Sequence, residues 1–266
     1  MSNNLDKVIV VKIGGATLNS GDTIIEDIVY LQKQGRRLVV VHGGAKEIND
    51  WLSRLGISTR FVEGERVTDK ATLEVVTAVL AGLVNKEIVA AINNLGGYAV
   101  GLSGVDGALI QGRIKDREMG YTGTVAKLEV NLLRVLLESG YIPVISPVSL
   151  YSFDRPRQAP QILNINGDPV AGEIAAAIGA EKLVFLSDVV GICNGQGRPL
   201  KRLSPAEAEA LITSGAVSGG MIPKVRACLK ALATTSTTHI IDGREPHALL
   251  KEVETDGSGT TIEAVR

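Results

Sequence analysis

The stretch VIVVKIGGATL at residues 8–18 opens the regular part of the chain. Its four consecutive β-branched residues predict a strand that is buried on both faces, as in a parallel sheet. Lys12 stands at the end of this strand, where burying a charge is costly unless an anion is present. Gly14 and Gly15 are expected to offer main-chain N–H groups beside it. The combination predicts a phosphate-binding site; the alternatives for Lys12 are an ion pair within the fold or a side chain that snorkels toward water.

Short apolar runs alternate with helix-like patterns along the rest of the chain. Further strands are predicted at 37–44, 98–104, 141–148, 182–188, 238–242 and 260–265. Near-continuous apolar strands joined by helices predict a mostly parallel sheet that is covered by helices on both faces. We therefore expect an α/β fold, a three-layer αβα sandwich around a mostly parallel central sheet.

Local signals indicate where several helices begin and end. Ser204 and Glu207 form a predicted capping box, with a proline in the first turn between them. Thr68 and Asp69 are the expected cap of a long helical segment, 72–97, which we expect to break near Gly82.

The composition excludes several classes of function. The 266 residues carry a formal net charge of −1, which argues against a nucleic acid or an anionic membrane as partner. No purely apolar run approaches the ~20 residues of a membrane span. The N-terminal MSNNLDK lacks the apolar core of a signal peptide, so a cytoplasmic location is expected. Cys193 and Cys228 lack metal-ligand spacing and are expected to be free, buried thiols.

Glycine pairs follow the first two predicted strands. Gly43 and Gly44 come after the second strand, as Gly14 and Gly15 come after the first. Ligands of open parallel sheets lie beyond the carboxyl ends of the strands, and helix N-termini there favour anions. Neither GxxxxGK[ST] nor a post-strand GxGxxG occurs, so phosphate would be bound by another route. His42 is expected to be a structural hydrogen-bonding residue.

Two hairpin-rich segments, 55–70 and 105–125, are predicted to rim a substrate pocket. Arg66 lies in the first of them. It is either a surface arginine or a pocket residue, and in a pocket its guanidinium would suit bidentate recognition of a carboxylate.

Three polar residues in the second half of the chain complete the candidate site residues. Asn164 alternates with apolar residues at a strand end, in LNINGD. Asp168, which precedes a proline, is either a helix N-cap or a carboxylate that holds cationic side chains in place. Lys224 follows a glycine pair at a helix start, where a cation is disfavoured unless an anion is bound. Without a nucleophile–base pair, these groups fit phosphoryl transfer, in which positioning and charge neutralisation dominate.

Several motifs together resemble the acetylglutamate kinases, a branch of the amino-acid kinase family. They are VVKIGG, VHGG, RVTDK with GLVNKEIV, GLSGVDG, NINGDPVAGEIAAAIGAEKLVFLSDVVGI, and SGGMIPKV with HIIDG. The resemblance runs from about residue 8 to 262. It departs from the family pattern at Ala45, where a glycine is usual, and at Gly167, where an alanine is usual.

The resemblance implies that MgATP phosphorylates the side-chain carboxylate of N-acetyl-L-glutamate, giving N-acetyl-L-glutamyl 5-phosphate in arginine biosynthesis. Lys12 and Lys224 would neutralise the transferring phosphoryl group, and Asp168 would organise both lysines. No general base is needed, because a carboxylate is already ionised at pH 7. Substrate contacts would come from Gly44, Ala45, Arg66 and Asn164, and phosphate contacts from Gly14, Gly15, Gly43 and Gly44. Nucleotide contacts would come from Asp188, Val189, Gly191, Ile192, Ser218, Gly219 and Met221.

The resemblance also implies one kinase domain over residues 1–266, with a substrate lobe (about 1–180) and an ATP lobe (about 181–266). Magnesium would be held mainly by the nucleotide rather than by protein ligands. Arginine-inhibited members carry an extra N-terminal helix. Only about seven residues precede the first predicted strand here, so we expect that helix to be absent. HALLKEVETDGSGTTI nevertheless resembles their C-terminal arginine-site signature. We expect an arginine-insensitive homodimer; no motif predicts a regulator of the PII type.

Two alternatives remain open at this point. A kinase of the same fold could act on a carrier-protein-linked aminoadipate or glutamate, although the balanced charge offers no basic surface for an acidic carrier. The chain could also be a non-catalytic nucleotide-binding protein, although such a protein would not require both lysines and Asp168.

Overall fold

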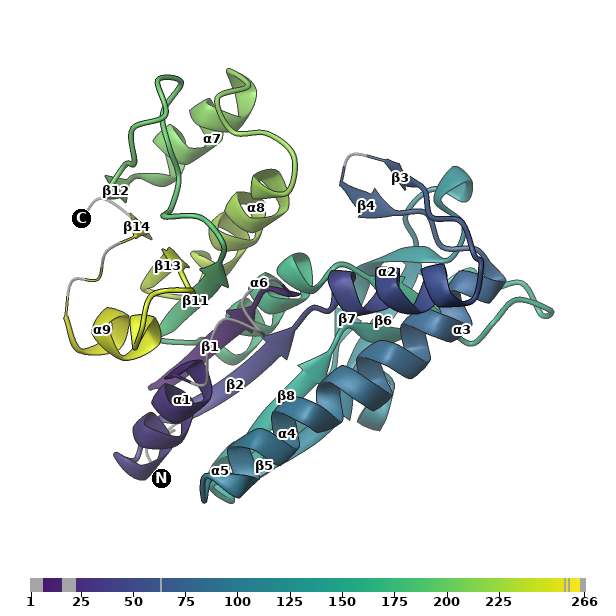
Figure 1. Cartoon of the computed structure of the whole chain (residues 1–266), viewed down its shortest axis with the longest axis horizontal. Coiled ribbons are helices and arrows are strands. Elements are labelled where there is room, and N and C mark those ends of the chain that lie inside the picture. Colours follow the sequence, from purple (N-terminus) through teal and green to yellow (C-terminus); the bar gives the residue numbers. More distant parts are fainter. Residues whose placement is uncertain (1–6, 16–22, 63, 256, 258, 264–266) are drawn as a thin grey trace.

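The structure, a computed structural model, describes residues 7–15, 23–62, 64–255, 257 and 259–263. Its centre is an eight-stranded sheet with helices on both faces (Figure 1). In spatial order the strands are β12 (Arg202–Leu203), β14 (Thr260–Glu263), β13 (Thr237–Asp242), β11 (Lys182–Ser187), β1 (Val8–Ile13), β2 (Arg37–His42), β8 (Ile142–Ser146) and β5 (Ala99–Ser103). All neighbours are parallel except β13 and β14, so the predicted three-layer α/β fold is confirmed.

Each face of the sheet is covered by its own set of helices. One face carries α1 (Thr23–Lys33), α2 (Ala45–Arg54), α3 (Lys70–Thr77), the π-helical segment η2 (Ala78–Val84), α4 (Asn85–Asn94) and α9 (Ala248–Glu254). The other carries α5 (Asn131–Glu138), α6 (Gly167–Ile178), α7 (Pro205–Thr213) and α8 (Met221–Ala231).

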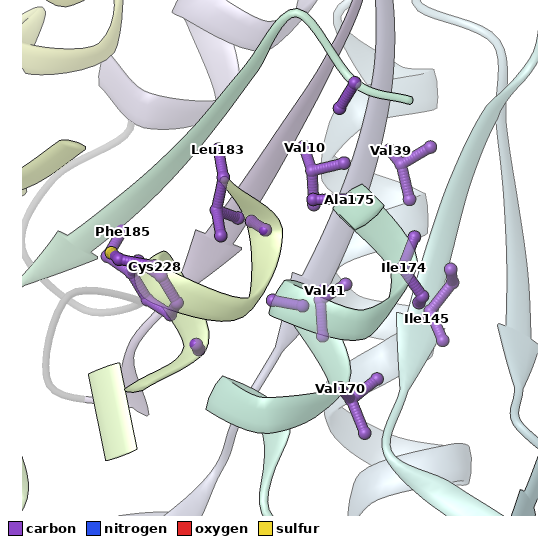
Figure 2. Close-up of a cluster of buried hydrophobic side chains, with 14 of the residues drawn as sticks. Val10, Val39, Val41, Ile145, Val170, Ile174, Ala175, Leu183, Phe185 and Cys228 are labelled. Atoms are coloured by element: carbon purple, nitrogen blue, oxygen red, sulfur yellow. The ribbon is translucent and has the colours of Figure 1, made fainter. Parts of the chain in front are cut away.

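The strand β1 shows why its sequence reads as continuously apolar. Val8 and Val10 pack into the hydrophobic core under α6 and α8, whereas Ile9 and Val11 pack into the core under α1 and α4. A strand buried on both faces needs apolar residues at every position. Figure 2 shows the first of these cores, where side chains of α6 lie against those of the sheet.

Smaller strands lie beside the main sheet. β6 (Ile110–Ile114), β7 (Thr122–Leu128), β9 (Val148–Tyr151) and β10 (Ile162–Ile165) close into a small barrel, and β3 (Phe61–Val62) pairs with β4 (Glu65–Arg66) as a hairpin. Of two short 3₁₀ turns, η3 (Asp106–Ala108) leads from β5 into β6, and η4 (Arg117–Met119) lies between β6 and β7. Hairpins were expected at 55–70 and 105–125, but the closure of β6 and β7 with β9 and β10 into a barrel was not.

The long helix expected at 72–97 forms without breaking, because η2 joins α3 to α4 in one helical run around Gly82. By length and composition Lys70–Asn94 is apolar enough to span a membrane. Its apolar side chains, among them Val76, Val84 and Ile92, instead fill the core beneath it, as in a helix of a globular core. The capping predictions hold at Asp69, which accepts from Thr72 N, and at Ser204 with Glu207.

Candidate active site

Lys12 lies on the β1 face that α6 covers, since it alternates with Val8 and Val10. Its side chain is 8% exposed, and Nζ lies 2.5 Å from Asp168 Oδ1. A buried ammonium so placed requires a counter-charge, and Asp168 provides it.

Asp168 occupies the first turn of α6. The N-cap is Asn166, whose side chain accepts a hydrogen bond from Asp168 N, so the alternative of Asp168 as the helix cap is wrong. The cap leaves the Asp168 carboxylate free to face the sheet. There its second oxygen, Oδ2, accepts a hydrogen bond of 2.9 Å from Lys224 Nζ.

The two lysines keep Asp168 ionised. Burial by itself would raise the pKa of this carboxyl, but the charges of Lys12 and Lys224 and their hydrogen bonds outweigh it and lower the pKa below its usual value. Two positive charges on one carboxylate leave a net positive charge at the edge of the sheet. That site is built to accept a further anion.

Lys224 reaches Asp168 because α8 packs closely on α6. At the crossing, a Cβ built on Gly172 would lie 2.6 Å from Ala227 O and 2.9 Å from Ala227 Cα, so only glycine allows this approach. Cys228, one turn after Lys224, is buried in the core under α8, and this burial raises its thiol pKa to about 12. Cys193 is only partly buried, so the expectation of a buried thiol is wrong there.

Glycine loops close the site on the other side of Lys12. Gly14 N–H donates to Leu186 O and Gly43 N–H to Ile13 O, which draws the ends of β1, β2 and β11 together. The expectation of phosphate contacts from these two N–H groups is therefore wrong, because both are already bonded within the sheet. Gly44 has φ 156°, and a Cβ there would lie 2.7 Å from Leu80 Cδ2. The main chain of Gly15 and Gly44 thus borders the site without side chains.

His42 is held as a neutral imidazole. Burial lowers its pKa to about 4. Nδ1 lies 2.8 Å from Gly43 O, an acceptor, so Nδ1 carries the proton; Nε2 then accepts from Asn85 Nδ2 at 3.1 Å. This agrees with the structural role expected for His42. The sequence analysis did not predict a role for Asn85. Its amide side chain at the end of the otherwise apolar run LAGLVN could have indicated a buried hydrogen-bonding residue.

Arg66 is 7% exposed, at the end of β4, which excludes the surface alternative. Its guanidinium lies over the Phe61 ring at 4.8 Å, and Nη2 donates to Asn49 Oδ1 at 2.7 Å. Nη1 is buried and has no hydrogen-bond partner among the described residues. Burial also lowers the pKa of this guanidinium, so the site gains from an anion that pairs with it.

A cavity of about 290 Å³ joins these groups. It is lined by every predicted catalytic, substrate and phosphate residue: Lys12, Gly14, Gly15, Gly43, Gly44, Ala45, Arg66, Asn164, Asp168 and Lys224. A second groove of about 630 Å³ continues outward between the β3–β4 hairpin and α8.

The predicted nucleotide residues are more scattered. Asp188 lines the cavity, and Gly219 lines the adjoining groove. Ile192 is buried, and its N–H donates to Thr260 Oγ1 at 2.8 Å. The remaining candidates divide into the exposed Val189 and Ser218, the partly buried Met221, and the buried Gly191 with φ 132°.

Comparisons with known proteins agree with this geometry. The model described as "Amino acid kinase family" matches residues 7–242. An acetylglutamate kinase of Dehalococcoides mccartyi (strain CBDB1) is 50% identical over 98% of this chain and 96% of its own. One of Thermosynechococcus vestitus is 51% identical over 96% of this chain and 88% of its own.

Solved structures share the architecture. An N-acetylglutamate synthase from Neisseria gonorrhoeae, complexed with coenzyme A and N-acetyl-glutamate, superposes with a TM-score of 0.84 at 25% identity, covering 98% of this chain and 60% of that one. Carbamate kinase from Giardia lamblia, bound to AMP-PNP, shares the fold with a TM-score of 0.71 at 16% identity and covers 100% of both chains. The chain belongs to the amino acid kinase family and, within it, to the acetylglutamate kinases.

Proposed function

We propose that this chain transfers the γ-phosphoryl group of ATP to the side-chain carboxylate of N-acetyl-L-glutamate, in arginine biosynthesis. The observation that carries the proposal is the buried Lys12–Asp168–Lys224 cluster at the end of a cavity. Its net positive charge suits a phosphoryl group whose negative charge must be neutralised during transfer.

The chemistry needs positioning rather than a base. The substrate carboxylate attacks the γ-phosphorus, the bond from phosphorus to the β–γ bridging oxygen breaks, and ADP leaves with the electron pair. Lys12 and Lys224 would contact the transferring group, while main-chain N–H groups at Gly15 and Gly44 would donate to its oxygens. The neutral His42 fits this scheme, since no proton has to be removed.

The acyl amino acid would lie between the glycine loops and the hairpin. Arg66 would bind its α-carboxylate through Nη1, the buried donor without a partner among the described residues. Asn164, Gly44 and Ala45 would complete this half of the cavity.

ATP would extend toward the C-terminal lobe, about 181–266, and the substrate would occupy the N-terminal lobe, about 1–180. Asp188, Val189, Gly191, Ile192, Ser218, Gly219 and Met221 are the proposed nucleotide contacts. Mg²⁺ would be carried mainly by phosphate oxygens of the nucleotide. When bound, Mg²⁺ would neutralise phosphate charge.

We further propose a cytoplasmic homodimer. β5 is an edge of the main sheet, and Leu95, Tyr98 and Tyr141 are exposed apolar residues near the start of β5 and β8. An apolar patch beside an open edge favours self-association.

A substrate panel tests the proposed function. Purified protein, MgATP and hydroxylamine, which traps acyl phosphates as hydroxamates, are incubated with N-acetyl-L-glutamate, free L-glutamate or N-acetyl-L-aminoadipate. We expect fast hydroxamate formation from N-acetyl-L-glutamate and little from free L-glutamate or N-acetyl-L-aminoadipate. A preference for the longer acid, or no turnover of any, would favour a carrier-linked substrate or a non-catalytic role.

A further inference from the structure

A chain of buried hydroxyl groups connects Asn164 to the main chain of Arg66. Asn164 Nδ2 lies 3.0 Å from Thr68 Oγ1, and Thr68 Oγ1 lies 3.0 Å from Thr122 Oγ1. Thr122 Oγ1 in turn donates to Arg66 O at 2.6 Å. Thr68 is fully buried and Thr122 is 3% exposed, so water does not compete for these contacts.

The orientation of Asn164 follows from counting protons. Arg66 O can only accept, and each threonine hydroxyl has a single proton. Either Thr122 donates to Arg66 O and accepts from Thr68, or Thr68 donates to Arg66 O at 3.2 Å and accepts from Thr122. In both arrangements the proton of Thr68 is already used. Asn164 must therefore present its NH₂ group to Thr68. Its Oδ1, which has no hydrogen-bond partner among the described residues, then remains an available acceptor in a residue that lines the cavity.

The main chain runs alongside this hydroxyl chain. Thr68 N donates to Met119 O, Tyr121 N to Thr68 O, and Asn164 N to Tyr121 O. This ladder fastens the segment after β4 to β7 and β10 of the barrel. Arg66 and Asn164, separated by almost a hundred residues, are thereby fixed against each other.

We propose that Thr68 and Thr122 are positioning residues for recognition of the acyl amino acid, acting through Arg66 and Asn164. The inference rests on the proposed function, because it takes those two residues as substrate contacts. Thr68 does not line the cavity, whereas Thr122 does. An effect of Thr68 on substrate binding must therefore pass through Asn164 and Arg66.

Thr68→Val is the main test, since valine keeps the shape and removes the hydroxyl. Loss of the hydroxyl chain should raise KM for N-acetyl-L-glutamate by about tenfold, which corresponds to the free energy of one well-placed hydrogen bond. KM for ATP and kcat should stay within about twofold, a split that general loosening of the fold would not produce. Thr68→Ser restores the hydroxyl and should restore KM.

Thr238→Val is the matched control. Thr238 is also fully buried and donates its hydroxyl to a main-chain carbonyl, Ile262 O, but it lies in β13 and lines neither the cavity nor the adjoining groove. The Thr238→Val protein should be less stable than the wild type, with an unchanged KM for N-acetyl-L-glutamate.

The outcomes separate the two proposals. An unchanged KM in Thr68→Val, or equal losses in both KM values and kcat, contradicts the positioning role. If Thr68→Val does not fold, Thr122→Val is judged against Thr122→Ser by the same criteria. A wild-type protein that forms no hydroxamate from N-acetyl-L-glutamate contradicts the proposed function, whereas wild-type turnover with an unaffected Thr68→Val contradicts the hydroxyl chain alone.

Discussion

At the scale of single residues, the site depends on one carboxylate shared by two ammonium groups. Asp168 is 4% exposed and contacts Lys12 and Lys224 through different oxygens. Removing one member of a buried ion cluster leaves the other charges without compensation, which costs far more than an exposed pair would.

Asp168→Asn should therefore destabilise the protein by about 3–5 kcal/mol, because the buried ammonium group of Lys12 and the partly buried one of Lys224 then face each other without a counter-charge. A bound polyphosphate should return part of this loss. Thermal unfolding with and without ATP measures both effects.

Glu173→Gln is the control, since Glu173 pairs with the half-exposed Lys230 at 3.3 Å. It should cost less than about 1 kcal/mol. Equal losses in the two variants would show that the cluster is no more than a surface ion pair.

His42 predicts a dependence of stability on pH. Its pKa falls from 6.5 to about 4 on folding, so the unfolded chain binds the extra proton between these values. Stability is fully present above pH 6.5 and is lost as pH falls toward 4, by up to about 3 kcal/mol from this group. The free energy of unfolding, measured with denaturant from pH 7 to 4, should fall more steeply with decreasing pH in the wild type than in His42→Asn. Parallel curves would mean that His42 is not held neutral.

Some of these residues could be predicted from the sequence and others could not. Lysine at the end of a β-branched run and glycines after it carry a local signal, so Lys12 and its loop could be predicted. The choice for Asp168 between cap and counter-ion could not be made, because it depends on Asn166 taking the cap and on two lysines brought by other elements. Thr68 was expected only at the helix cap, and Thr122 was not singled out, because nothing in the sequence distinguishes a threonine with a buried, hydrogen-bonded hydroxyl from any other threonine.

At the scale of elements, the contact between α6 and α8 sets the distance from Asp168 to Lys224. The helices approach closely because Gly172 has no side chain where Ala227 crosses it. Any Cβ at that point has to move α8 outward, and Lys224 with it.

Gly172→Ala should therefore lower stability by about 1–3 kcal/mol through overpacking, and should lower kcat as well. Gly82→Ala is the matched control, because a Cβ at Gly82 meets no atom within 4 Å. Denaturant unfolding and steady-state kinetics measure both variants. Unchanged stability and kcat in Gly172→Ala would contradict the account of this contact.

Elements with local signals were predictable, and those defined by distant partners were not. The capping box at Ser204 and the apolar strands follow from neighbouring residues. Helix α9 was missed because its N-terminus has no cap of its own: His247 has φ 55°, and Asp27 of α1 accepts the N–H of Leu250. The barrel was missed for the same reason, as its short strands pair across the chain.

At the scale of the whole molecule, two hydrophobic cores sandwich one sheet, and the cavity lies where the carboxyl ends of its central strands meet. This placement is general for open parallel sheets, so the site region could be predicted from strand order alone.

Association is the whole-molecule prediction. Light scattering should give a dimer, and Tyr98→Asp, which puts a charge on the exposed tyrosine near the edge strand, should shift the protein toward monomer. Arginine should leave both mass and activity unchanged. A monomeric wild type, or inhibition by micromolar arginine, would contradict this prediction.

The central claim, that Lys12 and Lys224 neutralise a phosphoryl group in transfer to a carboxylate, is tested most directly by hydroxamate formation from N-acetyl-L-glutamate in Lys224→Ala. The account predicts a fall in kcat of about a hundredfold or more, with ATP affinity changed only a few-fold. A Lys224→Ala enzyme that keeps the wild-type kcat would contradict it.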